Sequence, residues 1–356
     1  MVKLPNAAGM ALPRFALLLF LVSTLLTTGC GLFGAHTKVQ VPQLLTPLAE
    51  ANKASLMQEV NRLAAIKSIH GKVDIQFEDT SFASSGIAEK YRQVDGAITL
   101  QRPGQIYLII QFTFVDIAQM ASDGEHFSVA VLKGDDKYRR FVKGTNNAVY
   151  ARLDGDDSAV EAKNVKQKNV KQKTEKETVS ALSNLRPQHL TDALMVRPIT
   201  AGDSLVYSQS QFFQEEPDNR LQAKKGTRIM RGYYLLEEFS QPTAGDARLL
   251  RRFWFDRVAG IRLARLQTFD ERGFLITDVG YSNEKPFGST AQVTLPSRIE
   301  LTRPQDQYKL SITYQDPASV ELNKEFRPEA FVLENKWQLP EVDLDAQRIK
   351  KVTANH

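Results

Sequence analysis

The stretch Gly96–Phe112, GAITLQRPGQIYLIIQF, carries the strongest indication of the fold. In its first half, Ile98 and Leu100 alternate with polar residues, which is typical of a strand with one buried face. Arg102-Pro103-Gly104 is a turn signal. Gln105–Phe112 is apolar at nearly every position, which predicts a strand covered on both faces. Strands joined by short turns of this kind pair in antiparallel fashion.

The same period of two extends to both sides of this hairpin. Before it, Val73, Ile75 and Phe77 alternate with charged and polar residues and predict a strand over 72–78. After it, strands are predicted at Gly124–Leu132, Arg231–Phe239, Leu249–Phe255, Ile261–Phe269, Phe274–Tyr281, Val293–Leu301 and Tyr308–Tyr314. The sequence therefore predicts a mainly β protein with roughly ten or eleven antiparallel strands.

Two helices are expected beside the strands. Pro47–Ile66 has apolar residues at helical spacing, with Pro47 in the first turn and Thr46 as the N-cap. A short second helix is expected at Pro187–Met195. Between the two halves, residues 152–185 are polar and contain a direct repeat, NVKQK-NVKQK.

The polar segment 152–185 lies between strands of the same pattern, so we interpret it as an insertion within one domain, residues 47–340. Its lysines could contact anionic lipid headgroups, or the segment could be a plain solvated loop. Residues 341–356 are expected to form a C-terminal tail.

The N-terminus resembles a bacterial lipoprotein signal. Phe15–Leu26 is an apolar run too short to span a bilayer comfortably, and it leads through small residues to Cys30, the only cysteine. We expect residues 1–29 to be a signal peptide, Cys30 to be acylated, and residues 30–46 to be a tether. The alternative is an ordinary secretory signal. A single cysteine excludes an internal disulfide and any multi-cysteine metal site.

The charge of the chain gives little indication of a partner. Its 356 residues contain 46 Lys and Arg against 41 Asp and Glu, for a formal charge of +5. Removal of residues 1–29 would delete Lys3 and Arg14 and lower this charge to +3. Nucleic-acid binding needs a clustered basic face, so we expect no nucleic-acid partner.

Signals for catalysis and metal binding are absent from the sequence. There is no GxSxG, HExxH, GxxxxGK[ST] or GxGxxG, and no two of the five histidines have metal-ligand spacing. The acidic run Leu153–Ser158 lacks the glycine and glutamate that a calcium loop needs at its sixth and twelfth positions. We expect a protein that is not an enzyme, with no catalytic residue, cofactor or metal.

Two groups of turn motifs resemble those of LolA/LolB-type lipoprotein carriers and receptors. The first is Gly96–Gly104 followed by Ser122-Asp123-Gly124, and the second is Phe253–Asp256, Phe269–Gly273 and Tyr281-Ser282. The resemblance extends over residues 66–145 and 229–335. It implies a half-open antiparallel β-barrel of about eleven strands, covered by helices and enclosing an apolar cavity that accepts acyl chains.

The resemblance also implies candidate site residues. Inward-facing cavity candidates are Ile75, Phe77, Ile98, Leu100, Phe127, Val129, Leu310 and Ile312, and plain core packing is the alternative for each. Arg102 matches a family arginine that helps hold the lid helix, or it is a simple turn residue. Phe114 and Val115 correspond to the receptor's exposed membrane-facing loop, with a buried strand end as the alternative.

Taken with Cys30, the resemblance favours the anchored receptor over the soluble carrier. We therefore expect a lipid-anchored protein of the bacterial cell envelope, at the outer membrane and facing the periplasm. Its cargo would be acyl chains or lipoproteins, delivered by a periplasmic carrier. The alternative function is a structural or interaction lipoprotein whose half-barrel is filled by its own side chains. This chain is longer than typical receptors of this type, and its segment 186–230 has no counterpart in the resemblance.

Overall fold

The computed structural model describes residues 41–80, 89–90, 93–134, 136, 139–148, 150, 185–200, 202, 204–220, 222–241, 246–258, 260–290 and 293–348. The chain divides into two units, residues 1–43 and 44–356, and the second contains the fold described below. The predicted signal peptide, Cys30, most of the tether and almost all of the insertion 152–185 lie outside the described residues.

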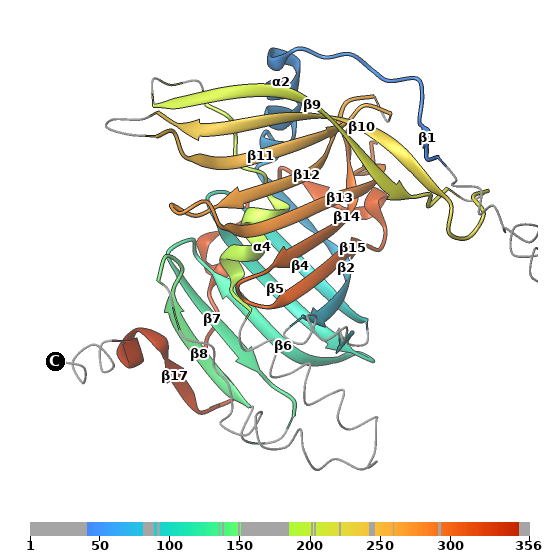
Figure 1. Cartoon of the computed structure of the whole chain (residues 1–356). Helices are drawn as coiled ribbons and strands as arrows, with labels where there is room; N and C mark the ends of the chain where they lie inside the picture. Colours follow the sequence, from blue (N-terminus) through green and yellow to red (C-terminus); the bar gives the residue numbers. More distant parts are fainter. Residues whose placement is uncertain are drawn as a thin grey trace, which may run out of the picture. The chain divides into compact units, whose positions relative to one another are not determined.

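The protein is mainly β, as predicted, and the sheet is open (Figure 1). Its long strands are β2 (Ser68–Asp79), β4 (Val94–Gln101), β5 (Gln105–Phe112), β6 (Val115–Ser122), β7 (His126–Val131), β8 (Arg140–Thr145), β9 (Leu205–Pro217), β10 (Arg228–Ser240), β11 (Leu249–Asp256), β12 (Arg262–Phe269), β13 (Leu275–Phe287), β14 (Val293–Arg303) and β15 (Tyr308–Tyr314). The short ones are β1 (Gln43–Leu44), β3 (Glu89–Lys90), β16 (Glu321–Leu322) and β17 (Glu341–Asp343).

The long strands pair in the order β9, β10, β11, β12, β13, β14, β15, β2, β4, β5, β6, β7, β8, and every pair in this series is antiparallel. The chain therefore builds the sheet outward from a centre where β15, a late strand, pairs with β2, an early one. Among the described residues, β8 and β9 do not pair with each other, which leaves the sheet open.

Three of the thirteen long strands were not anticipated from the sequence, namely β6, β8 and β9. In β9 most positions are Ser, Gln, Glu or half-exposed residues, so its apolar alternation is weak. Its outer edge pairs with no other long strand in the described part of the chain. Tertiary pairing with β10 over thirteen positions holds it extended despite this weak pattern. The expected tail also contributes structure, because β17 pairs with β8 in parallel.

The first described helix, α2 (Lys53–Ala64), is shorter than predicted. It begins at Lys53 because the Asn52 side chain caps it, accepting a hydrogen bond from the Ser55 backbone N–H at 2.9 Å. The prediction of a start at Pro47 with Thr46 as the N-cap was wrong. The backbone before Asn52 is bound to the sheet instead, through Leu45 N–H to the Met230 carbonyl and Ala49 N–H to the Arg257 carbonyl, each 2.9 Å.

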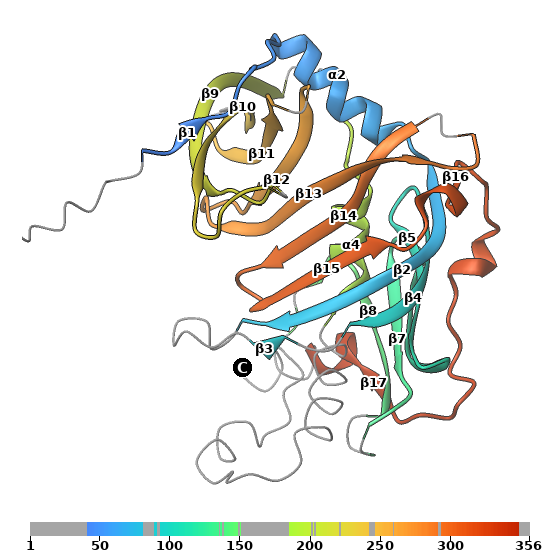
Figure 2. The same ribbon diagram turned by 90° about the vertical axis from the view of Figure 1, so that its right-hand side faces the viewer.

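The second helix, α4 (Pro187–Leu194), agrees with the prediction within one residue. Pro187 occupies the first turn, where a missing N–H is tolerated. The sheet curves so that α4 lies inside its bend, between β14 on one side and β5 and β6 on the other (Figure 2). Two segments far apart in the sheet order therefore meet the same short helix.

Candidate functional site

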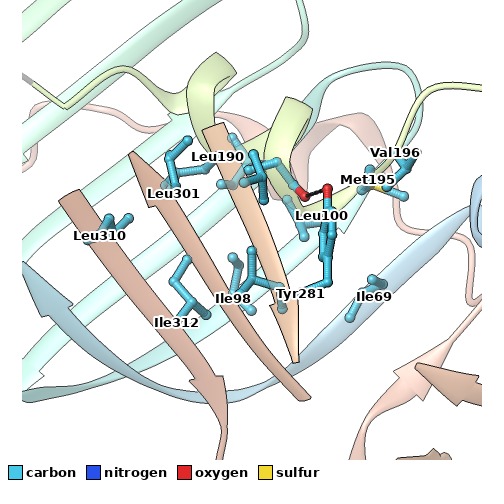
Figure 3. Packing of buried hydrophobic residues seen from close by; sticks show 14 of the residues in the cluster. Ile69, Ile98, Leu100, Leu190, Met195, Val196, Tyr281, Leu301, Leu310 and Ile312 are labelled. Carbon is cyan, nitrogen blue, oxygen red and sulfur yellow. Dashed lines mark hydrogen bonds between the residues drawn. The ribbon is translucent and has the colours of Figure 1, made fainter. Parts of the chain in front are cut away.

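The apolar face of α4 covers the interior of the curved sheet. Leu190 and Ala193 of this helix are buried, and they belong to the main hydrophobic cluster together with side chains from both halves of the sheet. Figure 3 shows Leu190 and Met195 in one cluster with Ile98, Leu100, Leu310 and Ile312. The helix thus closes the region that the sequence resemblance implies as an acyl-chain cavity.

The structure brings all the cavity candidates together. Register pairs Phe77 with Leu310 and Ile75 with Ile312 on β2 and β15. None of the eight candidates is more than 6% exposed, and all belong to the main cluster: Ile75, Phe77, Ile98, Leu100, Phe127, Val129, Leu310 and Ile312. In this conformation they contact neighbouring side chains of the core.

The space that remains inside is small. An apolar cavity of about 30 Å³ lies near the C-terminal ends of α2 and α4, with Leu63, Leu194, Tyr281 and Tyr314 among its lining residues. None of the eight candidates lines it. Pockets for drug-sized ligands measure ~300–1,000 Å³, so this cavity is too small for an acyl chain unless α4 or its neighbours move.

Arg102, at the β4–β5 turn, joins the segments that follow both helices. Its Nε donates to the Ile66 carbonyl at 2.9 Å, and its Nη2 donates to the Val196 carbonyl at 2.7 Å. Partial burial lowers the pKa of Arg102 by desolvation. The side chain therefore does more than complete a turn, since it fixes the exit of α2 against the exit of α4.

The last turn of α4 and the segment after it are held by further side chains, of which only Tyr281 belongs to a sequence motif, and that motif gives it no role in holding the helix. Tyr281 donates to the Ala193 carbonyl at 2.9 Å, and Arg251 donates to the carbonyls of Arg197 at 3.1 Å and Pro198 at 3.3 Å. Asn61 makes two bonds with the Ile199 backbone, at 2.8 and 3.1 Å. No local pattern identifies these residues, because each contacts α4 or its exit across a large sequence separation.

The beginning of α4 is held differently. His189 Nδ1 lies 2.7 Å from the Tyr308 hydroxyl, and burial, together with the charges of Arg303 and Arg186, lowers the pKa of His189 well below its ordinary value. The guanidinium of Arg186 lies 5.3 Å from the ring centres of both Phe127 and Tyr150. This end of the helix thus depends on aromatic contacts and on side-chain hydrogen bonds, of which the second runs from Gln188 Nε2 to Asn147 Oδ1 at 3.4 Å.

Phe114 and Val115 lie at the β5–β6 hairpin. Thr113 and Phe114 both have positive φ, 47° and 67°, as expected in a tight hairpin turn. Phe114 is 96% exposed and Val115 is 46% exposed. A bulky aromatic residue in a left-handed conformation is uncommon, and here its ring points away from the core.

The described residues contain no group of three or more His, Cys, Asp or Glu arranged to hold a metal ion. In the same part of the chain, no helix is both long and apolar enough to cross a membrane. The acidic run Leu153–Ser158 lies outside the described residues.

Comparison with protein-family models and with curated proteins gives no match. Solved structures with a similar arrangement include a LolA superfamily protein from Nitrosomonas europaea, with a TM-score of 0.40 and 11% identity over 80% of this chain and 99% of that one. A candidate outer membrane lipoprotein-sorting protein domain from Vibrio parahaemolyticus has a TM-score of 0.36 and 11% identity over 80% and 97%. A DUF1329 family protein from Desulfovibrio piger has a TM-score of 0.38 and 9% identity over 78% and 95%. One of these structures is thus named for the superfamily that the sequence motifs resemble.

Proposed function

We propose that the protein is a lipid-anchored, non-enzymatic component of the bacterial envelope that binds acyl chains or lipoproteins beneath α4. In this proposal Cys30 carries the anchor, the sheet is an incomplete barrel, and α4 is its movable cover. In this proposal a periplasmic carrier delivers the acyl chains or lipoproteins to the protein at the outer membrane.

The observation that carries the proposal is the way α4 is attached. Its underside contacts apolar side chains from both halves of an open sheet, whereas its ends are held by discrete polar contacts. Displacing α4 would uncover a continuous apolar surface, and each acyl methylene buried there would stabilise the complex by about 0.8 kcal/mol.

The exposed Phe114 supports a role at a membrane. Phe114, 96% exposed, and Val115, 46% exposed, together offer apolar surface at the hairpin tip that a partner could bury. In the proposed function that partner is the bilayer, into which the β5–β6 hairpin would insert Phe114 and guide the cargo.

A second candidate function is a structural envelope lipoprotein with a self-filled core. The small interior cavity favours it, because the eight cavity candidates already fill the space between the strands and α4. In that case α4 would be a fixed part of the core and its polar contacts would serve stability alone.

Mass spectrometry of the purified chain carrying Cys30→Ser separates the two candidates. Co-purifying acyl lipid or lipopeptide at about one molecule per chain would support the proposed function. A protein that stays free of lipid, including after incubation with excess lipopeptide, would favour the self-filled core.

The role of Phe114 needs a test that leaves the fold intact. We expect Phe114→Glu to abolish delivery of bound lipopeptide to vesicles, because a carboxylate resists entry into the apolar layer, while the thermal midpoint is retained. Phe274 is a matched control, since it is also an exposed phenylalanine, 58%, next to the turn of another hairpin. Equal loss of delivery in Phe274→Glu would contradict a specific role for Phe114.

A further inference from the structure

Arg186 has an unusual environment at the start of α4. Its guanidinium lies against two aromatic rings, with Phe127 on β7 and Tyr150 each 5.3 Å from the guanidinium carbon and 6.3 Å from each other. Gly144 makes room for these rings, because a Cβ there would lie 2.9 Å from the Phe127 ring and 3.0 Å from the Tyr150 hydroxyl. The site is therefore built around the arginine by three separate elements of the chain.

The guanidinium lacks a full set of hydrogen-bond acceptors. Its Nη1 is buried and has no acceptor among the described residues. The acids nearby are already bound, because Asp306 accepts from Arg303 Nε at 2.7 Å, and Asp345 accepts from the Tyr150 hydroxyl and from Thr145 Oγ1. A buried charged donor without an acceptor is costly, so an incoming acceptor would be favoured here.

Positive charge lies near Arg186, and Asp306, the carboxylate that acts on it, is itself paired with Arg303. The positive charges of Arg303 and Arg186 both reach His189. Together with burial, they lower the pKa of His189. The first turn of α4 contains no acidic residue, so the positive end of the helix dipole is not offset there. These features favour a negatively charged group over a neutral one.

Arg186 is also continuous with the apolar interior. Phe127, which contacts the guanidinium, is one of the cavity candidates, and Phe77 stacks on Tyr308 at 5.5 Å next to His189. A cation at the edge of an apolar region matches a ligand with an acyl chain and a negatively charged head.

We propose that Arg186 binds the oxyanion headgroup of an acyl-chain ligand, so that the site selects carboxylates or phosphate esters over neutral amphiphiles. This inference rests on the proposed function, because it names the class of cargo for the same interior. A planar guanidinium can donate to two oxygens of a carboxylate or phosphate ester at once. The single hydroxyl oxygen of a neutral alcohol cannot form this paired interaction. Binding would also favour the displaced state of α4, since the headgroup supplies the acceptor that the covered state lacks.

The test compares three ligands with the same chain length on the full chain carrying Cys30→Ser. Hexadecanoate, hexadecyl phosphate and hexadecan-1-ol would each be titrated against a displaceable fluorescent acyl probe. We expect both anions to bind at least about tenfold more tightly than the alcohol, as one charge-assisted hydrogen bond allows. Equal affinity for the alcohol and the anions would overturn the inference and leave the proposed function intact, whereas failure of all three ligands to bind would overturn both.

Variants assign the preference to Arg186. We expect Arg186→Met to remove the preference for anions while the affinity for hexadecan-1-ol is retained, and Arg186→Lys to keep part of it. Arg272 is a matched control, because its guanidinium also lies 5.3 Å from a phenylalanine ring, that of Phe274, at an exposed hairpin. An unchanged preference in a folded Arg186→Met, or the same loss in Arg272→Met, would overturn the assignment.

A last arm distinguishes a headgroup from a free anion. Inorganic phosphate alone should compete with hexadecyl phosphate only weakly, because it gains no burial of an acyl chain. If it bound as tightly as hexadecyl phosphate, the site would be one for free anions and the inference would fail. If Arg186→Met did not fold, Arg186→Gln would replace it. The ratio of the affinities for the anions and for hexadecan-1-ol, measured in the chain that keeps Arg186, would still decide the question.

Discussion

Arg102 Nη2 donates a hydrogen bond to the Val196 carbonyl oxygen across 2.7 Å, which ties the β4–β5 turn to the segment that follows α4. The same guanidinium reaches the Ile66 carbonyl at 2.9 Å. One side chain thus couples the exits of two helices that are more than a hundred residues apart in the chain.

The first prediction concerns this arginine. We expect Arg102→Met to lower the free energy of unfolding by about 1–3 kcal/mol, because two backbone carbonyls lose a charged donor. Amide hydrogen exchange should accelerate in residues 193–199 more than in the central strands. Arg272→Met, at an exposed hairpin, serves as the control. Equal acceleration throughout the sheet would argue against a local coupling.

The second prediction tests the packing around Arg186. Gly144→Ala would place a Cβ 2.9 Å from Phe127 Cζ, and we expect it to cost about 1–3 kcal/mol of stability by overpacking. Gly202→Ala is the matched control, since nothing lies within 4 Å of the added Cβ. Chemical denaturation of the two variants measures the difference. Comparable midpoints would show that the Phe127 ring moves aside freely.

The third prediction concerns the start of α2. Asn52→Ala removes the acceptor of the Ser55 N–H and should cost about 1 kcal/mol. Asn52→Asp keeps an acceptor and should restore most of this stability. Thermal unfolding of the three proteins provides the measurement. If the alanine and aspartate variants behaved alike, the helix would owe its start to packing rather than to the cap.

The fourth prediction is a pH dependence. Because the pKa of His189 is lowered in the folded protein, the unfolded chain binds a proton more readily below about pH 6.5. Stability from the neutral histidine is therefore fully present above that pH and is lost as the pH falls, by up to about 1.4 kcal/mol per unit.

Substitution isolates this contribution of His189. His189→Phe should flatten the change in stability between pH 7 and pH 5, measured by urea unfolding, even if its absolute stability is lower. A wild-type slope that persisted in His189→Phe would assign the pH dependence to other groups.

Much of the fold follows from local patterns. The alternation at Val73, Ile75 and Phe77 and at Ile98 and Leu100 places these side chains on one face of a strand whatever the rest of the chain does, and all of them are buried. The short helix at Pro187 was also predictable, because proline starts it and Leu190 and Ala193 give it an apolar face.

Other features were outside the reach of local patterns. β9 is extended only because β10 pairs with it, and α2 starts six residues later than expected because the preceding backbone is already bound to the sheet. Phe114 could be proposed as a tip residue from the sequence, whereas its exposure depends on how β5 and β6 pair.

The sequence by itself determined the alternation that makes this a β protein, the position of its single cysteine and the presence of a short helix before the second run of strands. Only the tertiary structure decided what that helix covers and what holds it. Arg102, Tyr281 and Arg251 reach α4, or the segment that follows it, from distant parts of the chain, and Arg186 at its start meets Phe127 of β7. Periodicity records which face of an element is apolar, but not which distant side chain will meet it, because that depends on the order in which the strands pair.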